Sequence, residues 1–360
     1  VSLSYLHIDQ NVKKISTYIT KKVSDRLQSI FKNDRKEWEE KWDALKIFIE
    51  YGMLTQEDFY DKAKAYALLK DVDGKYFTQE EYTTLVKDAQ TDKDGRMICL
   101  YASEVDAQYT YIEQAKQRGY NVLLLDGQLD IPVVQMLESK MEKTSFVRVD
   151  SDTIDHLIVK EDNKREELPE ARRDNLAEVF NSQMPKADKV NDHVEAAAMG
   201  AEAAPAVITQ SEYMRRMKEM AHIQPGMSFY GEMPDMYTLV LNTDHPLVQS
   251  ILTESEGATE SDLRPIDAEI KSLEAQKAIM EKEQEGKKQD ELSQQQKDDL
   301  AKLRTDITAQ QDKRKAVLAA FAAGNDRVHQ LIDLALLQNG MLKGEALARF
   351  VARSVELIKQ

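Results

Sequence analysis

Residues 326–359 read DRVHQLIDLALLQNGMLKGEALARFVARSVELIK, and this stretch predicts how the chain is organised. Apolar residues recur every three or four positions on both sides of Asn339 and Gly340, as in two consecutive amphipathic helices. Two such helices carry more apolar surface than a short terminal segment can bury, and a two-fold axis would complete a four-helix bundle. We therefore expect a homodimer, although both helices could instead pack onto the rest of the same chain. The expected contact residues are Leu331, Ile332, Ala335, Leu336, Leu347, Phe350, Val351, Val355 and Ile358.

The composition describes a globular chain with an acidic surface. Its 360 residues, of which 42% are apolar, suffice for two or three domains with a core in each. The formal net charge of -15 disfavours nucleic acid and membrane partners, because both are bound mainly through basic surface. A single cysteine, Cys99, excludes a disulfide framework and a cysteine-based metal site. The sequence shows neither a signal peptide nor an apolar run of membrane length, so we expect a cytoplasmic soluble protein, and the initial Val1 indicates a fragment.

Changes of periodicity predict a mostly helical multidomain protein that combines α+β and α/β parts. Residues 1–95 show helical spacing and predict a helical part. Residues 96–165 change to short apolar runs and predict a small αβα three-layer subdomain. Residues 166–360 predict an α+β dimerisation domain that contains a coiled-coil-like insertion at about 261–321.

The predicted αβα subdomain carries the only hint of an enzyme. Strands at 97–101, 121–125 and 146–149 alternate with helices at 104–117 and 131–140, as in a parallel sheet. Asp126 follows the second strand, at the edge where open parallel sheets often hold ligands. An enzyme with a small-ligand site near Asp126 is therefore an alternative function. An aspartate at a strand end more often has a turn or helix-cap role. No second carboxylate or Gly-rich phosphate loop follows at a spacing that would indicate catalysis.

Methionines concentrate in the predicted helix at 212–221. Met214, Met217 and Met220 lie there, with Tyr213 beside them. Flexible thioethers repack against unlike apolar partners, which suits a surface that binds many proteins. Gap-filling in an ordinary core explains the same spacing.

The insertion at 261–321 is rich in Glu, Lys, Gln and Asp, with a heptad seam that begins at Leu263 and Ile266. A polar stretch around Gly286 separates it from a second apolar series that begins at Leu300. We expect an antiparallel helical hairpin with arms of about two dozen residues, roughly 35 Å long. A structural adaptor that uses this hairpin as its arm is a third possible function.

Several segments together resemble the heat shock protein 90 chaperones of the bacterial HtpG type. Their order along the chain is more specific than any one of them, and together they span nearly all of it. The segments are NVKKISTYITKKVSDRLQSIFK at 11–32, residues 96–126, APAVITQSEYMRRMKEM at 204–220, LVLNTDHPLV at 239–248 and LIDLALLQNGMLKGEALARFVARSVELI at 331–358.

The resemblance implies part of the middle domain and the C-terminal dimerisation domain of an ATP-dependent chaperone. It implies a homodimer that binds partly folded client proteins, with Tyr213, Met214, Met217 and Met220 in the client-binding helix. ATP and Mg would belong to the full-length protein, since the ATPase domain has no counterpart here. Leu3 occupies the expected position of the arginine that reaches the ATP phosphate. We therefore expect no catalytic residue, metal site or cofactor in this chain.

Overall fold

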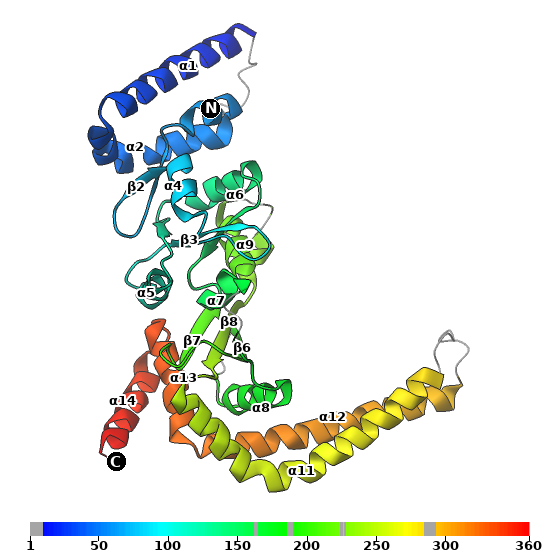
Figure 1. Ribbon diagram of the computed structural model, residues 1–360. Helices are drawn as coiled ribbons and strands as arrows, with labels where there is room; N and C mark the ends of the chain where they lie inside the picture. Colours follow the sequence, from blue (N-terminus) through cyan, green and yellow to red (C-terminus); the bar gives the residue numbers. More distant parts are fainter. Residues whose placement is uncertain are drawn as a thin grey trace. The chain divides into compact units, whose positions relative to one another are not determined.

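The computed structural model describes residues 10–161, 165–185, 190–223, 226, 228–283 and 293–359. Two compact units divide the chain (Figure 1): Val1–Lys164 with Arg215–Ile223, and Arg165–Met214 with Gln224–Gln360. Most of the described residues are helical, and three small sheets lie among them, so the protein is a mostly helical α+β protein as predicted. No helix in the described part of the chain combines the length and the apolar character that crossing a bilayer requires.

Helices and a short hairpin make up the amino-terminal part of the first unit. Asp34 separates the first two helices, and its side chain accepts the backbone N–H of Glu37, which caps the second. The buried Trp38 donates its indole N–H to the carbonyl of Tyr66 at 2.9 Å, so this part has an aromatic core. The elements are α1 (Gln10–Asn33), α2 (Arg35–Thr55), α3 (Glu57–Ala63), β1 (Leu68–Lys70), β2 (Tyr76–Thr78) and α4 (Gln79–Val86).

A parallel sheet forms the rest of the first unit. Its strand order is β4-β3-β5, with the central strand β3 buried at every residue. Both outer strands pair parallel to β3, which confirms the predicted alternation of three strands and two helices. Their continuous apolar runs are typical of strands that are covered on both faces. The elements are β3 (Met97–Ala102), α5 (Tyr109–Gln117), β4 (Val122–Leu124), α6 (Asp130–Lys140), β5 (Thr144–Arg148) and α7 (Ile154–Leu157).

A mixed sheet with the order β6-β8-β7 forms the centre of the second unit. Strand β6 pairs parallel to β8 along eight residues, and β7 pairs antiparallel to β8. Ala196 and Ala197 are the last two residues of β6. The core is formed by this sheet together with α8, α13, the first half of α11 and the end of α12. The elements are α8 (Glu170–Asn181), β6 (Val190–Ala197), β7 (Ala206–Gln210), α10 (Ser228–Glu232), β8 (Asp235–Asn242), α11 (Pro246–Glu283), α12 (Gln294–Ala323), α13 (Asp326–Gln338) and α14 (Gly344–Ile358). Helix α9 (Glu212–Ile223) follows β7, and its residues Arg215–Ile223 belong to the first unit.

The predicted hairpin is present, but its first arm is longer than expected (Figure 1). A single helix, α11, runs for 38 residues from Pro246, so the first arm begins well before the predicted position of about residue 261. At 1.5 Å per residue α11 is roughly 57 Å long. Leu263 and Ile307 are buried between the two arms, and Arg314 of α12 pairs with Asp267 of α11 at 2.8 Å.

The turn between β8 and α11 is organised by one buried side chain, Asn242. Its amide donates to the carbonyls of Gly200 (2.8 Å) and Ala204 (3.2 Å). Its carbonyl oxygen accepts the backbone N–H groups of Met199 and Asp244, both at 3.1 Å. Asn242 therefore ties the β6–β7 connection to the start of the long helix.

Replacing Asn242 with aspartate should destabilise the second unit strongly. The new carboxylate cannot donate to the two carbonyls, and it places a buried negative charge against them. We expect a loss of about 3 kcal/mol or more in the free energy of unfolding, measured by denaturant titration at neutral pH. The control is Asn181→Asp at the exposed end of α8, which should change stability by less than about 0.5 kcal/mol. Equal losses in the two variants would contradict the role assigned to Asn242.

Candidate functional site

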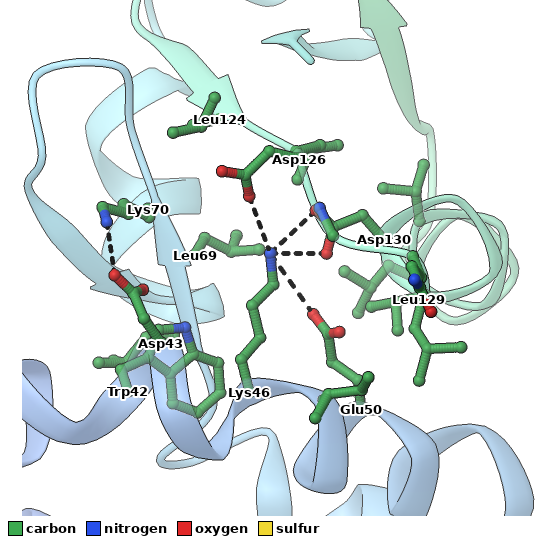
Figure 2. A pocket seen from close by; sticks show the side chains of 18 residues that line it. Trp42, Asp43, Lys46, Glu50, Leu69, Lys70, Leu124, Asp126, Leu129 and Asp130 are labelled. Atoms are coloured by element: carbon green, nitrogen blue, oxygen red, sulfur yellow. Dashed lines mark hydrogen bonds and ion pairs between the residues drawn. The ribbon is translucent and has the colours of Figure 1, made fainter. Parts of the chain in front are cut away.

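A pocket of about 320 Å³ opens in the first unit at the carboxyl end of β4 (Figure 2). Helix α2, strand β1 and the segment from β4 into α6 provide its lining. Apolar side chains form much of its wall, among them the buried Trp42, Leu125 and Val133. The pocket therefore lies at the sheet edge where Asp126 was expected to mark a ligand site.

A cluster of charged groups surrounds Lys46 in this pocket (Figure 2). The Lys46 ammonium is 2.7 and 2.9 Å from the two carboxylate oxygens of Asp130, which is buried at the start of α6. Asp126 and Glu50 are more distant, at 3.9 and 4.0 Å from the same ammonium. One lysine thus faces three carboxyl groups, and only Asp130 is close enough for a strong ion pair.

Gly127 allows the loop before α6 to close over this cluster. Its N–H donates to Asp130 at 2.8 Å. A Cβ atom at this position would lie 3.1 Å from a carboxylate oxygen of Asp130 and 3.2 Å from the Lys46 nitrogen. A larger residue would therefore require both partners of the ion pair to shift by a few tenths of an ångström, so glycine suits this position through close approach rather than through its backbone angles.

Glu50 is the unusual acid of the pocket. Only 7% of the residue is exposed. Burial raises the pKa of Glu50 to about 8, and the negative charge of Asp130 adds to the effect, whereas Lys46 opposes it. A hydrogen bond with Asp130 also favours the protonated form. Glu50 therefore keeps its proton at neutral pH, and the proton holds two carboxyl groups close together.

The sequence indicated only one member of this cluster, Asp126. Asp130 follows it by four residues, so the second carboxylate that was not recognised in the sequence is present in the structure. Lys46 and Glu50 are one helical turn apart on α2, but Lys46 lies 84 positions before Asp130. Nothing in the periodicity of α2 shows which element it packs against. Among the described residues, no group of three or more His, Cys, Asp or Glu side chains is arranged to hold a metal ion.

The residues predicted to bind clients lie on α9 with unequal exposure. Tyr213 is 62% exposed, Met214 and Met217 are half-buried, and Met220 is buried. The helix is attached to the parallel sheet, since Arg216 pairs with Glu138 at 2.8 Å. Arg215 also hydrogen-bonds the hydroxyl of Tyr101. Tyr213 is therefore the most accessible apolar side chain of the predicted set.

The residues predicted to form the dimer contact divide between two helices with different surroundings. Leu331, Ile332, Ala335 and Leu336 of α13 are buried in the core of the second unit, so the chain itself covers them. Leu347 and Phe350 of α14 are partly buried against the same core. Val351, Val355 and Ile358 remain exposed, at 52%, 46% and 84%. Leu3, expected at the position of the ATP-contacting arginine, lies outside the described residues.

Helix α14 is fixed to α13 by polar contacts on one side. Arg353 pairs with Asp333 at 3.0 Å, and Gln330 donates to Ser354 at 2.7 Å. These contacts turn Val351 and Val355 away from the core. The packing alternative considered for the two helices thus applies to α13, while α14 keeps an uncovered apolar side in the single chain.

Comparison with known proteins shows one family. A model described as Hsp90 protein matches residues 1–266. The chaperone protein HtpG of Bacteroides thetaiotaomicron is 58% identical over 358 residues, which is 99% of this chain and 53% of that protein. HtpG of Porphyromonas gingivalis is 48% identical over 358 residues, and HtpG of Francisella tularensis is 23% identical over 274 residues.

The extent of these matches is informative. The chain spans about half the length of the curated relatives that it matches most fully. The family model ends at residue 266, inside α11, whereas the Bacteroides match covers 99% of the chain and so includes the helical hairpin. The predicted resemblance is confirmed, and these relatives do not favour the alternative of an enzyme at Asp126.

Glu50→Gln should stabilise the first unit in a pH-dependent way. In the unfolded chain Glu50 releases its proton above the ordinary pKa of 4.5, whereas in the folded protein it keeps the proton up to about pH 8. The free energy of unfolding therefore falls as the pH rises from 4.5 to about 8. Glutamine can donate to Asp130 without this cost. We expect a gain on the order of 3 kcal/mol near pH 8 that vanishes near pH 4, measured by thermal unfolding.

Glu40→Gln on the exposed face of α2 is the control and should show no such pH dependence. A stability difference between Glu50→Gln and the unsubstituted chain that stays constant with pH would show that Glu50 is ionised in the folded protein.

Proposed function

The chain belongs to the Hsp90 protein family, and from this we propose that it is the middle and C-terminal part of an ATP-dependent HtpG-type chaperone. The identity of 58% along 99% of the chain to a protein named as a chaperone is the observation that carries this function. In our proposal residues 1–95 and 96–165 form the middle domain, and residues 166–360 form the dimerisation domain. ATP and Mg bind to the ATPase domain of the full-length protein, and this chain contributes dimerisation and client binding.

Dimerisation is supported by the uncovered side of α14. Ala348, Val351, Val355 and Ile358 follow one another at intervals of three or four residues, so they form a single apolar stripe. Glu345, Arg349 and Glu356 occupy a separate, polar stripe of the same helix. Two copies of α14 related by a two-fold axis would cover the apolar stripe of each other. The four core residues of α13 then support α14 from within, rather than touching the partner.

Dimerisation gives the chaperone its mechanism of coupling. Two ATPase domains attached to one dimer meet as neighbours at a high effective concentration, so a weak contact between them becomes an intramolecular event. Opening and closing on ATP can then be driven by that contact, while the C-terminal helices stay paired. This chain therefore acts as the permanent connection between the protomers.

Client binding is supported by the amphipathic character of α9. Tyr213 and Met217 are one turn apart, with Met214 beside them, while Arg215 and Arg216 attach the helix to the parallel sheet. An apolar patch of unbranched and aromatic side chains can bind exposed hydrophobic segments without sequence specificity. Met220 is buried, so in this proposal it supports the patch from below.

Val351→Asp should dissociate the dimer. A carboxylate in the apolar stripe would be desolvated without a partner, and we expect the dimer Kd to rise by about 100-fold, or roughly 3 kcal/mol. The measurement is sedimentation equilibrium over a range of concentrations.

Ala352→Asp, on the polar stripe next to it, is the matched control and should leave the Kd within about threefold of the unsubstituted chain. A chain that sediments as a monomer before any substitution would rule out dimerisation through α14.

Tyr213→Ser should weaken the suppression of client aggregation without changing the sedimentation mass. The substitution removes the most exposed aromatic group of the patch, and we expect at least a twofold loss of suppression per mole of chain. Tyr109→Ser is the matched control, because Tyr109 is 59% exposed and belongs to α5 rather than to α9. If the two variants suppress client aggregation equally well, Tyr213 does not contribute to client binding.

A further inference from the structure

Helix α9 is held on the parallel sheet of the first unit mainly by charged side chains. Arg215 and Arg216 are both buried, and arginine is rarely buried unless it is paired. The Arg215 guanidinium hydrogen-bonds the hydroxyl of Tyr101 in β3, and its central carbon lies 5.6 Å from the centre of the same ring. Arg215 also pairs with Glu219, one turn further along α9. The contact between α9 and β3 is therefore polar.

A second polar contact joins α9 to the edge of the sheet at Phe146 of β5. Glu138 of α6 accepts the backbone N–H of Phe146 at 2.7 Å, and Arg216 donates to the carbonyl of the same residue. Glu138 and Arg216 pair with each other at 2.8 Å. Because Glu138 bonds β5 directly, Arg216 can leave this arrangement without breaking the connection between α6 and β5.

The polar character of these contacts makes the attachment of α9 weak for the surface that it covers. Removing two guanidinium groups from water costs nearly as much free energy as their ion pairs return, whereas an apolar face would give a net gain. One carboxylate oxygen of Glu219, Oε2, is buried without a hydrogen-bond donor among the described residues, which adds to the cost. Release of α9 would return all of these groups to water. The helix is therefore easier to release than one that is held by apolar side chains.

Docking on the sheet covers one end of the apolar stripe of α9. Tyr213, Met217 and Met220 follow one another at intervals of four and three residues, so they lie on one side of the helix. Tyr213 is 62% exposed, Met217 is half-buried, and only 7% of Met220 is exposed. An apolar segment of another protein can therefore reach the Tyr213 end of the stripe, but not Met220, while α9 stays docked.

We propose that the docking of α9 on the first unit is an autoinhibitory contact, a strap that withholds Met220 from client proteins. Release of the two arginines from Tyr101 and Glu138 frees the helix and exposes the whole stripe. A partly folded client with exposed apolar side chains binds the released helix and covers Met220 again, so docking and full client binding exclude each other. This inference rests on the proposed client-binding role of α9.

The reactivity of a single thiol tests the strap without any client. In the Met220→Cys chain the thiol lies against the sheet and should react slowly with iodoacetamide. Glu138→Gln keeps an acceptor for the backbone N–H of β5 but removes the charge opposite Arg216, so adding it should speed the reaction at least fivefold. Tyr101→Phe, which removes only the hydroxyl that the other arginine contacts, should also speed the reaction.

Two controls separate release of the strap from opening of the sheet. Glu142→Gln changes an exposed glutamate just before β5 and should leave the reaction rate within about twofold. Cys99 is fully buried in β3, and burial raises the pKa of its thiol to about 12, so it reacts only if the sheet opens. An unchanged rate at position 220 in both the Glu138→Gln and the Tyr101→Phe chains would overturn the proposal. A parallel rise in the labelling of Cys99 in both chains would overturn it as well.

The inhibitory effect is measured in chains that keep Met220, with insulin that aggregates after reduction of its disulfides as the client. Glu138→Gln should suppress this aggregation at least twofold better per mole than the unsubstituted chain, whereas Glu142→Gln should not. Faster thiol labelling with unchanged suppression would overturn the inhibitory role.

The Tyr213→Ser substitution distinguishes failure of the strap from failure of the client site. If Tyr213→Ser lowers suppression but Glu138→Gln does not raise it, α9 binds clients and the strap proposal is wrong. If Tyr213→Ser has no effect with or without Glu138→Gln, the client site on α9 is wrong and the inhibitory role fails with it. Thiol labelling still reports in that case whether the helix leaves the sheet.

Discussion

The ion pair between Lys46 and Asp130 joins the helical part of the first unit to its parallel sheet. It crosses from α2 to the first turn of α6, at 2.7 Å, and Asp130 is buried. Two charges removed from water must remain together, because either one alone would be strongly destabilising. This requirement determines much of the surroundings: a glycine at position 127, the close approach of α2, and the protonation of Glu50, which would otherwise add a second negative charge to the same interior.

The second unit depends on hydrogen bonds from neutral groups instead. Asn242 uses both ends of its amide to connect the β6–β7 segment with the start of α11, and it does so without any charge to desolvate. The same core contains α13, which contributes fully buried residues, whereas α14 only packs partly buried side chains such as Leu347 and Phe350 against it. In this terminal segment α13 therefore stabilises the fold, whereas α14 keeps an exposed apolar side that a partner could cover.

Periodicity predicted which faces are buried, but not what buries them. The strands around Cys99 and Leu123 were recognisable because an uninterrupted apolar run of four or five residues between polar segments is typical of a buried strand. The α13–α14 pair was also recognisable, yet both helices show the same spacing, so assigning α13 to the chain's own sheet required the structure. Lys46 and Glu50 look like any charged pair on a solvated helix face in the sequence. Their role depends on a contact with a residue 84 positions away, and no local pattern records that.

The first arm of the hairpin was underestimated for a similar reason. The heptad spacing predicted a first arm that begins near residue 261, but the helix already begins at Pro246 and continues through Gly257. Helix propensity and packing of the flanking turns outweighed a local change in composition. The resemblance to the chaperone family came from the order of several segments, which is information that neither composition nor periodicity contains.

The continuity of α11 has a mechanical consequence. Its first turns, with Val248 and Ile251, are buried in the core, so the base of the arm is clamped while the far end is roughly 50 Å away. A stiff rod held at one end converts a small rotation at the base into a large displacement at the tip. Pro265 removes one backbone hydrogen bond within this rod, at the carbonyl of Ser261, and so gives it a single weaker section. A load applied along the arm would bend it first at that section, leaving the turn at Asn242 undisturbed.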